Sequence, residues 1–173
     1  MNNIKVQPYS DVYKNQVAQL ILNICEEFSI PISIQDQPDL DQIPQFYQKE
    51  SGNFWIALDG NKIVGTVALI DIGNGQAALR KMFVKRDYRG KEKEVAKFLL
   101  NALISWCNQK VIREIYLGTR AIFLAAHRFY EKNGFDEISK DTLPISFPVM
   151  QADSKFYIWR SRTNNGFYNT VFE

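Results

Sequence analysis

This 173-residue chain has few of the residues that build disulfide frameworks and metal centres: two cysteines and one histidine. Cys25 and Cys107 lie far apart, each within an apolar helical pattern, so we interpret them as buried free thiols in a reducing cytoplasm. One histidine and two scattered cysteines argue against a structural zinc site, and we expect no metal. A nucleophilic cysteine would need His127 as its partner, and the sequence leaves that alternative open.

The chain also lacks long hydrophobic runs and a strong charge of either sign. No run of about 18 uncharged apolar residues occurs, so we expect no transmembrane helix and no membrane partner. The first residues, Met1 to Lys5, lack the basic-then-apolar pattern of a signal peptide. With 21 basic and 19 acidic residues, the net charge of +2 does not favour a nucleic-acid-binding protein. These absences predict a cytoplasmic protein.

What is present is enough apolar material for a core, since 46% of the residues are hydrophobic and 13% are aromatic. The length is that of one domain, and no internal repeat, low-complexity segment or linker interrupts it. We therefore predict a single domain over residues 1–173. The segment 163–173 reads either as a frayed end or as an extra edge strand around Phe167 to Phe172.

Apolar periodicity and turn residues predict the order of the helices and strands. We predict helices from Ser10 or Asp11 to about Pro31, and over 39–50, 92–109 and 122–132, and strands over 4–9, 53–58, 63–70, 77–84, 113–117, 135–139 and 155–160. Turns at Asp59-Gly60 and Gly73-Asn74-Gly75 indicate three consecutive antiparallel strands. The fold class is α/β (α+β): a mixed, mostly antiparallel sheet of about seven strands flanked by helices.

A basic loop joins the strand that ends at Val84 to the following long helix. The unpaired N–H groups and the positive dipole end of a helix N-terminus suit a pyrophosphate. Gly90 permits close approach of the backbone, and Arg89 and Lys91 add positive charge. The alternative is an ordinary solvated turn, because acidic residues dilute the positive charge. No aromatic and basic stripe extends the loop, so it does not favour nucleic acid.

A second segment, Ala126 to Phe135, reads as a helix that ends at a left-handed Asn133-Gly134 cap and leads into a strand. Together the two segments resemble the GCN5-related N-acetyltransferase (GNAT) superfamily. The family's helix end with the pattern Tyr-Glu-Lys-x-Gly-Phe is matched by Tyr130 to Phe135, and its cofactor motif by Met82 to Val84, Tyr88 to Lys91, Val95-Ala96 and Leu99-Leu100.

Two positions depart from the family pattern. The passage from Arg89 to Ala96 is two residues longer than usual, with Glu92 and Glu94 where glycines are common, and Phe123 stands where many members have an asparagine that holds the pantetheine arm.

The resemblance implies acetyl-CoA as the donor. The backbone of Met82, Phe83 and Val84 would pair with the pantetheine arm like an added strand. The residues that would wrap the pyrophosphate are Arg89, Gly90, Lys91, Glu94, Val95 and Ala96. Tyr130 would act as the general acid that protonates the leaving thiolate. His127 would contact the cofactor or act as a base; the alternative is a packing or surface residue.

The function that the resemblance implies is an N-acetyltransferase that moves an acetyl group directly from acetyl-CoA to a primary amine of a small molecule or peptide. A non-catalytic acyl-CoA-binding or sensing module and a protein-interaction domain without cofactor are the alternatives. The base is unassigned, with Glu26, Glu27, Asp71 or a water chain as candidates.

The acceptor is not specified by the sequence. The segments expected to line its site are Phe28 to Pro44 and Pro144 to Pro148. The aromatic residues Phe28, Phe46, Tyr47 and Phe147 indicate a partly hydrophobic acceptor. The C-terminal segment with Phe167, Tyr168, Val171 and Phe172 would serve as an edge for a homodimer.

Overall fold

The computed structural model describes residues 3–162, and the predicted edge strand or dimer edge at 163–173 lies outside them. By its contacts the chain divides into two compact units, and the boundaries between them fall within two strands, after Asp71 and after Ala78, and also after Lys110. The first unit takes the described residues of Met1–Asp71 and Leu79–Lys110, and the second those of Ile72–Ala78 and Val111–Glu173. One domain over the whole chain therefore stays a prediction.

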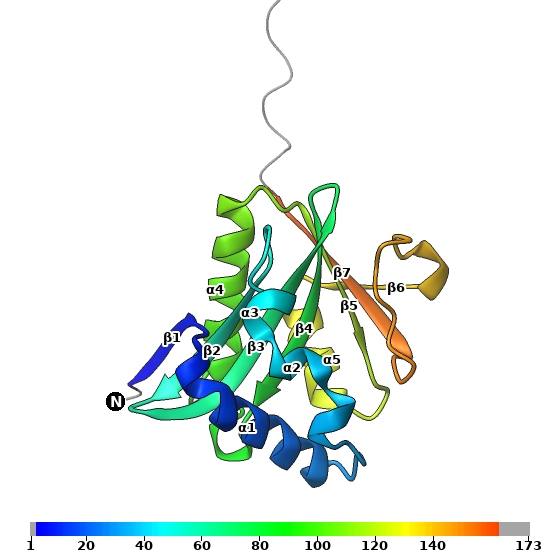
Figure 1. The fold of residues 1–173 in the computed structure, drawn as a ribbon. Coiled ribbons are helices and arrows are strands. Elements are labelled where there is room, and N and C mark those ends of the chain that lie inside the picture. The colour runs from blue at the N-terminus through cyan, green and yellow to red at the C-terminus, as the bar shows by residue number, and fades with distance from the viewer. Residues whose placement is uncertain (1–2, 163–173) are drawn as a thin grey trace, which may run out of the picture. The chain divides into compact units, whose positions relative to one another are not determined.

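The elements follow the predicted order (Figure 1). The strands are β1 (Ile4–Pro8), β2 (Asn53–Asp59), β3 (Lys62–Gly73), β4 (Gln76–Val84), β5 (Glu114–Thr119), β6 (Asp136–Ile138) and β7 (Lys155–Arg160). The α-helices are α1 (Lys14–Glu27), α2 (Pro38–Asp41), α3 (Ile43–Phe46), α4 (Val95–Gln109) and α5 (Leu124–Lys132). The short 3-10 helices are η1 (Asp11–Tyr13), η2 (Ile34–Asp36), η3 (Arg86–Tyr88) and η4 (Lys140–Thr142).

Within the described residues, seven strands form one sheet in the order β1-β2-β3-β4-β5-β7-β6. β1 with β2, β2 with β3, β5 with β7 and β6 with β7 pair antiparallel, whereas β4 and β5 pair parallel over Gln76–Ala78. The predicted mixed, mostly antiparallel sheet is confirmed.

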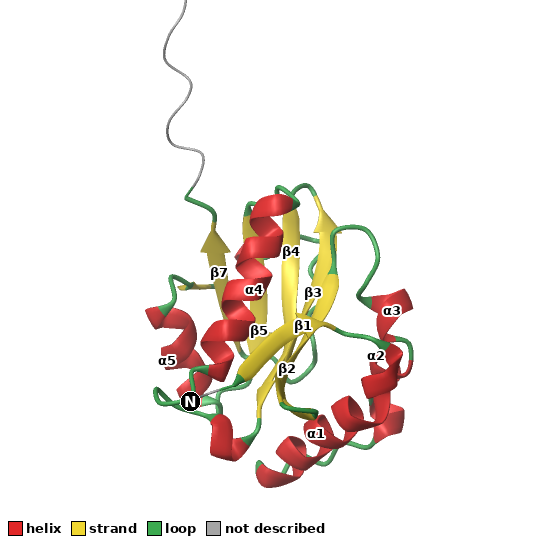
Figure 2. Cartoon of the chain, turned by 90° about the vertical axis from the view of Figure 1, so that its left-hand side faces the viewer, coloured by secondary structure: helices red, strands yellow, loops and turns green. Residues whose placement is uncertain are grey.

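In the first unit, helices cover both faces of the strands (Figures 1 and 2). Phe54 and Ile56 of β2 are fully buried in a cluster with α1, α2 and α3. Trp55, between them, points the other way and packs against Trp106 of α4. Burial on both faces explains why β2 is a continuous apolar run rather than an alternating pattern. Each large side chain buried in this way stabilises the unit by about 1.5–3 kcal/mol.

In the second unit, α5 lies against the β6–β7 pair. Tyr157 of β7 contacts the rings of both His127 and Tyr130 of α5. The helix ends as predicted: Gly134 is left-handed with a φ of +86°, and the N–H of Phe135 donates to the carbonyl of Tyr130 at 3.0 Å. This cap turns the chain into β6 and buries Phe135 beneath it.

Several bounds differ from the predicted helices; α1 ends at Glu27 rather than near Pro31, and α5 begins at Leu124 rather than at 122. The first predicted helix begins with η1, and Val12, placed on its apolar face by the spacing, is 82% exposed. The expected helix over 39–50 is divided at Gln42 into α2 and α3, because Pro44 near the start of α3 cannot donate the backbone bond that would continue the preceding turn. α4 starts at Val95 rather than near Glu92, because Glu94 adopts a left-handed conformation.

Candidate active site

The strand expected to pair with pantetheine is the C-terminal end of β4. The register of β4 with β5 covers Gln76–Ala78, and Met82, Phe83 and Val84 follow further along the strand. Phe83 packs against the α1 cluster and Val84 is buried, so side-chain packing fixes this end of the strand from within the first unit.

The loop between β4 and α4 contains two residues with a left-handed backbone conformation, Gly90 and Glu94. Gly90 has a φ of +96°, and open space surrounds the position where a Cβ would lie. Glu94, the N-cap residue of α4, has a φ of +50°, and its N–H donates to the carbonyl of Gly90 at 3.2 Å. Val95 and Ala96 thus begin α4 at its positive dipole end, the position that suits an anion. The passage from Arg89 to Ala96 therefore places the N-terminus of α4 after a left-handed glycine, Gly90.

Arg89 ties this loop to α1. Its guanidinium donates to both carboxylate oxygens of Glu27 at 2.7 and 2.9 Å, and its Nε donates to the carbonyl of Val84 at 2.8 Å. It also lies 5.3 Å from the centre of the Phe28 ring. The hydrogen bond from Arg89 lowers the pKa of Glu27, so this carboxylate is a weaker base than its type would indicate.

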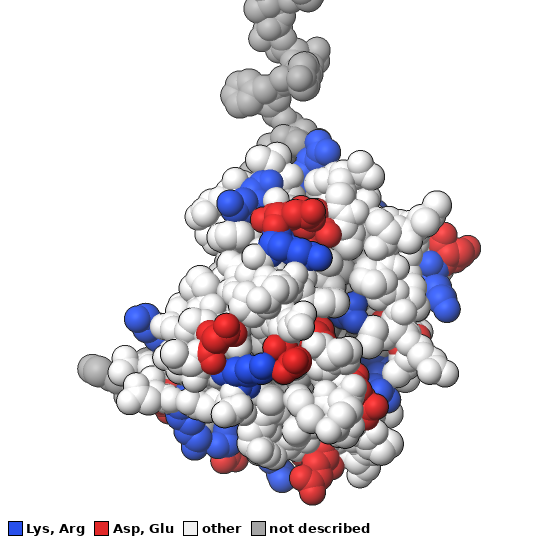
Figure 3. Space-filling view, in the orientation of Figure 1, with Lys and Arg blue, Asp and Glu red and all other residues white. Residues whose placement is uncertain are grey.

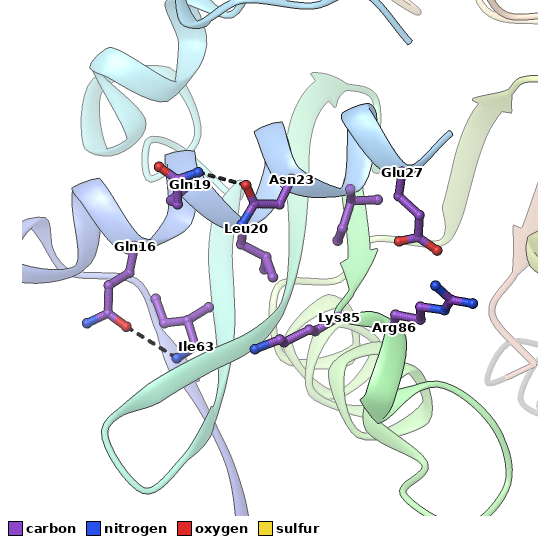
Figure 4. Close-up of a pocket in the computed structure, with 9 residues that line it drawn as sticks. Gln16, Gln19, Leu20, Asn23, Glu27, Ile63, Lys85 and Arg86 are labelled. Atoms are coloured by element: carbon purple, nitrogen blue, oxygen red, sulfur yellow. Dashed lines mark hydrogen bonds between the residues drawn. The ribbon is translucent and has the colours of Figure 1, made fainter. Parts of the chain in front are cut away.

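A groove of about 350 Å³ lies between α1 and the first residues of the loop (Figure 4). Amide side chains of α1 line one wall, and Lys85 and Arg86 line the other. The neighbouring Lys62 is the main cause that lowers the pKa of Lys85, so two amines lie close together at the start of the loop. Elsewhere, on the face shown in Figure 3, basic and acidic side chains lie in small mixed groups.

A buried polar network that the sequence did not reveal joins β4 to the segment after η2. Lys81 pairs with Asp39, with 3.1 Å between Nζ and Oδ2, and also bonds to the side chain of Gln37. The hydroxyl of Tyr47 donates to the same Asp39 oxygen at 2.5 Å. The one available signal was a lysine inside a strand whose other residues are mostly apolar.

Tyr130 and His127 belong to the second unit, one helical turn apart on α5. Tyr130 is 5% exposed and packs against Phe129, Phe135 and Tyr157. Burial, and secondarily Tyr157, raises the pKa of the Tyr130 hydroxyl. That hydroxyl therefore stays protonated at neutral pH, as a general acid must.

His127 is buried, and its Nε2 lies 2.9 Å from the carbonyl oxygen of Arg120. A carbonyl can only accept, so Nε2 carries a proton and is not the free base nitrogen. The ring also contacts Tyr157. These contacts support the packing alternative for His127.

In residues 3–162 no three His, Cys, Asp or Glu side chains gather so as to hold a metal ion. The same residues contain no helix with the length and apolar content needed to span a bilayer. Cys25 and Cys107 are both buried, and neither forms a disulfide.

Comparisons with known proteins show which family this chain belongs to. The model of the acetyltransferase (GNAT) family matches residues 19–135, which include both the β4–α4 passage and the Tyr130 helix. A solved GNAT acetyltransferase from Staphylococcus aureus Mu50 is 41% identical over 91% of this chain and 98% of that one, with a TM-score of 0.86. This chain therefore belongs to the acetyltransferase (GNAT) family.

Two further proteins are similar to this chain. An N-acetylaspartate synthetase of Xenopus tropicalis is 38% identical over 104 residues, 58% of this chain. The match spans 37% of that relative's length, so the chain covers well under half of it. The PaiA N-acetyltransferase of Thermoplasma acidophilum, solved with coenzyme A, shares the fold at a TM-score of 0.72 and 17% identity, over 92% of this chain and 99% of that one.

Proposed function

We propose that this protein is an N-acetyltransferase that moves an acetyl group from acetyl-CoA directly to a primary amine of a small molecule or peptide. The observation that carries the proposal is that the family match spans both the β4–α4 passage and the Tyr130 helix end. In the first unit, the N-terminus of α4 lies beside Gly90, which has open space around it. In the second unit, Tyr130 is buried and its raised pKa keeps it protonated. Both features support the proposed roles.

For the cofactor, the backbone of Met82–Val84 would pair with the pantetheine amides, and the start of α4 would meet the pyrophosphate. Since the Arg89 guanidinium is engaged by Glu27, its part would be to hold the loop while backbone N–H groups bind. The proposed cofactor-binding set is Met82, Phe83, Val84, Arg89, Gly90, Lys91, Glu94, Val95, Ala96 and His127. Of these, His127 would act through packing.

When bound, acetyl-CoA supplies the thioester carbonyl that the amine attacks and the thiolate that leaves. A backbone N–H on Met82–Val84 would stabilise the oxyanion, and the Tyr130 hydroxyl would give its proton to the sulfur. The amine proton must go to a base. Because Glu27 pairs with Arg89, it is a poorer candidate for this base. The other candidates are Glu26, Asp71 and a water chain.

The acceptor is proposed as an amine. L-aspartate is the first compound to test, because the curated relative is an N-acetylaspartate synthetase. Buried free thiols support a reducing, cytoplasmic location.

The test replaces Tyr130 by phenylalanine and follows thiol release with an amine panel that begins with L-aspartate. Loss of a general acid lowers kcat by about 10²–10⁴-fold, while the Kd of coenzyme A, measured by calorimetry, stays within about threefold. In the wild type, the raised pKa of Tyr130 predicts no alkaline loss of kcat from this group below about pH 10.

Tyr157→Phe is the matched control, since it removes a neighbouring aromatic hydroxyl that donates to Glu131 at 2.8 Å. It should leave kcat within a few fold. Equal loss in both variants, or unchanged turnover in Tyr130→Phe, removes Tyr130 from the mechanism. Coenzyme A binding without turnover on any amine would instead favour a sensing module.

A further inference from the structure

The backbone of β4 carries a strained residue directly before the proposed pantetheine strand. Lys81 has a φ of +54°, a left-handed conformation that costs a residue with a side chain about 1–2 kcal/mol. Its carbonyl accepts a 2.7 Å hydrogen bond from the hydroxyl of Thr66, a fully buried side chain on β3. Strain of this kind persists only where the surroundings fix it, and it concentrates at functional sites.

Contacts with Asp39 and Gln37 also hold the side chain of Lys81 in place. Lys81 and Asp39 side chains are 9% and 14% exposed, and their ion pair is completed by Gln37 and by the hydroxyl of Tyr47. Burial is the main cause that lowers the pKa of Lys81, and Asp39 opposes it. The ammonium thus joins β4 to a segment that contains α2 and α3.

Such a network is a poor source of stability. The attraction between two buried charges offsets little more than the free energy needed to remove both from water. Apolar side chains of similar volume often stabilise a core better. A strained backbone and a buried ion pair at one residue, both immediately before Met82, therefore indicate a role in fixing geometry.

We propose that Lys81 is a positioning residue for the pantetheine arm of coenzyme A. By holding the left-handed turn of β4 from both sides, Thr66 and Asp39 set the direction in which the backbone amides of Met82–Val84 point. The inference rests on the proposed function, because it concerns the same cofactor strand. Its ligand is the amide-bearing arm, while the nucleotide half meets the α4 end of the site.

The experiment measures Kd by calorimetry for two probes, coenzyme A and adenosine 3′,5′-bisphosphate, which lacks the pantetheine arm. The variant Lys81→Met/Asp39→Asn removes both charges together, so the net charge is unchanged and no unpaired ion is left buried. We expect coenzyme A to bind about tenfold more weakly and the bisphosphate to bind within about twofold of wild type.

The matched control is Lys14→Met/Asp41→Asn, which removes an ion pair of 2.8 Å that also holds α2 but does not touch β4. Both probes should bind it as they bind wild type. A second variant, Thr66→Val, releases the Lys81 carbonyl while keeping the side-chain shape, and should show the same selective loss. Circular dichroism and thermal unfolding establish that each variant is folded at the assay temperature.

The outcomes separate the two proposals. Failure of wild-type protein to bind coenzyme A overturns the proposed function and, with it, the role of Lys81. Normal coenzyme A binding by the folded Lys81→Met/Asp39→Asn and Thr66→Val variants overturns the role of Lys81 alone. Equal weakening of both probes would show that the network supports the whole fold rather than the pantetheine strand. If neither the double variant nor Thr66→Val folds, the network is structural and the positioning role is rejected.

Discussion

Gly65 on β3 lies close to both α4 and the proposed cofactor strand. A Cβ added there would lie 3.0 Å from Leu99 Cδ1, 3.1 Å from Val95 Cγ1 and 3.1 Å from the carbonyl oxygen of Phe83. Ordinary van der Waals contacts begin at about 3.4 Å, so each neighbour must move by a few tenths of an ångström. Val95 is the first residue of α4, and Phe83 belongs to the strand expected to bind pantetheine.

We predict that Gly65→Ala lowers both stability and coenzyme A affinity. Overpacking a filled core costs about 1–3 kcal/mol. For a chain of this size each kcal/mol lowers Tm by about 2–4 °C, which gives a fall of about 2–12 °C in a thermal scan. Because the displaced atoms belong to both parts of the proposed cofactor site, the Kd of coenzyme A should rise about 3–10-fold in calorimetry.

Gly60→Ala provides the comparison. Gly60 has a φ of +60° with open space around it, so the substitution strains the backbone by about 1–2 kcal/mol without touching α4 or β4. It should lower Tm by a similar amount and leave the Kd of coenzyme A unchanged. The reasoning is refuted if Gly65→Ala changes neither quantity, or if Gly60→Ala weakens coenzyme A binding as much.

Two further predictions concern charges and thiols. Because Arg89 lowers the folded-state pKa of Glu27, their pair should stabilise the fold above the unfolded value of about 4.3 and lose that effect as pH falls through the lowered pKa. Glu27→Gln should therefore cost at most about 1 kcal/mol at pH 7 and nothing at strongly acid pH, as measured by urea unfolding; an equal cost at both would contradict the assignment. Burial raises the pKa of the Cys107 thiol to about 12, and Cys25 is buried as well, so a thiol reagent should react with neither until guanidinium unfolds the chain. Rapid reaction of the native protein would show that one of these thiols is accessible.

Local patterns in the sequence predicted most of the elements because each pattern has a local physical cause. The Asp59-Gly60 turn, the apolar run of β2 and the Asn133-Gly134 cap each act within a few residues, and the structure has the hairpin, the strand and the helix end at these places. The break between α2 and α3 also has a local cause, since Pro44 cannot continue the preceding turn, so the prediction of one helix over 39–50 was wrong.

The contacts of the charged residues could not be predicted from the sequence, because they join positions far apart in the chain. Asp39 and Lys81, or Glu27 and Arg89, follow no periodic pattern that pairs them, and only the packing of α1 and α2 against the sheet brings them together. The left-handed conformations of Lys81 and Glu94 were hidden for a related reason, since neither residue type favours that conformation locally.

The sequence by itself determined the succession of strands and helices, the cap after Tyr130 and the basic glycine loop before α4, since local periodicity and turn chemistry suffice for these. Only the tertiary structure decided that Lys81 and Arg89 pair with carboxylates. It also decided that Tyr130 is buried with a raised pKa and that the backbone of β4 is left-handed at Lys81. Those properties depend on desolvation and on distances between remote residues, and both exist only once the chain has packed.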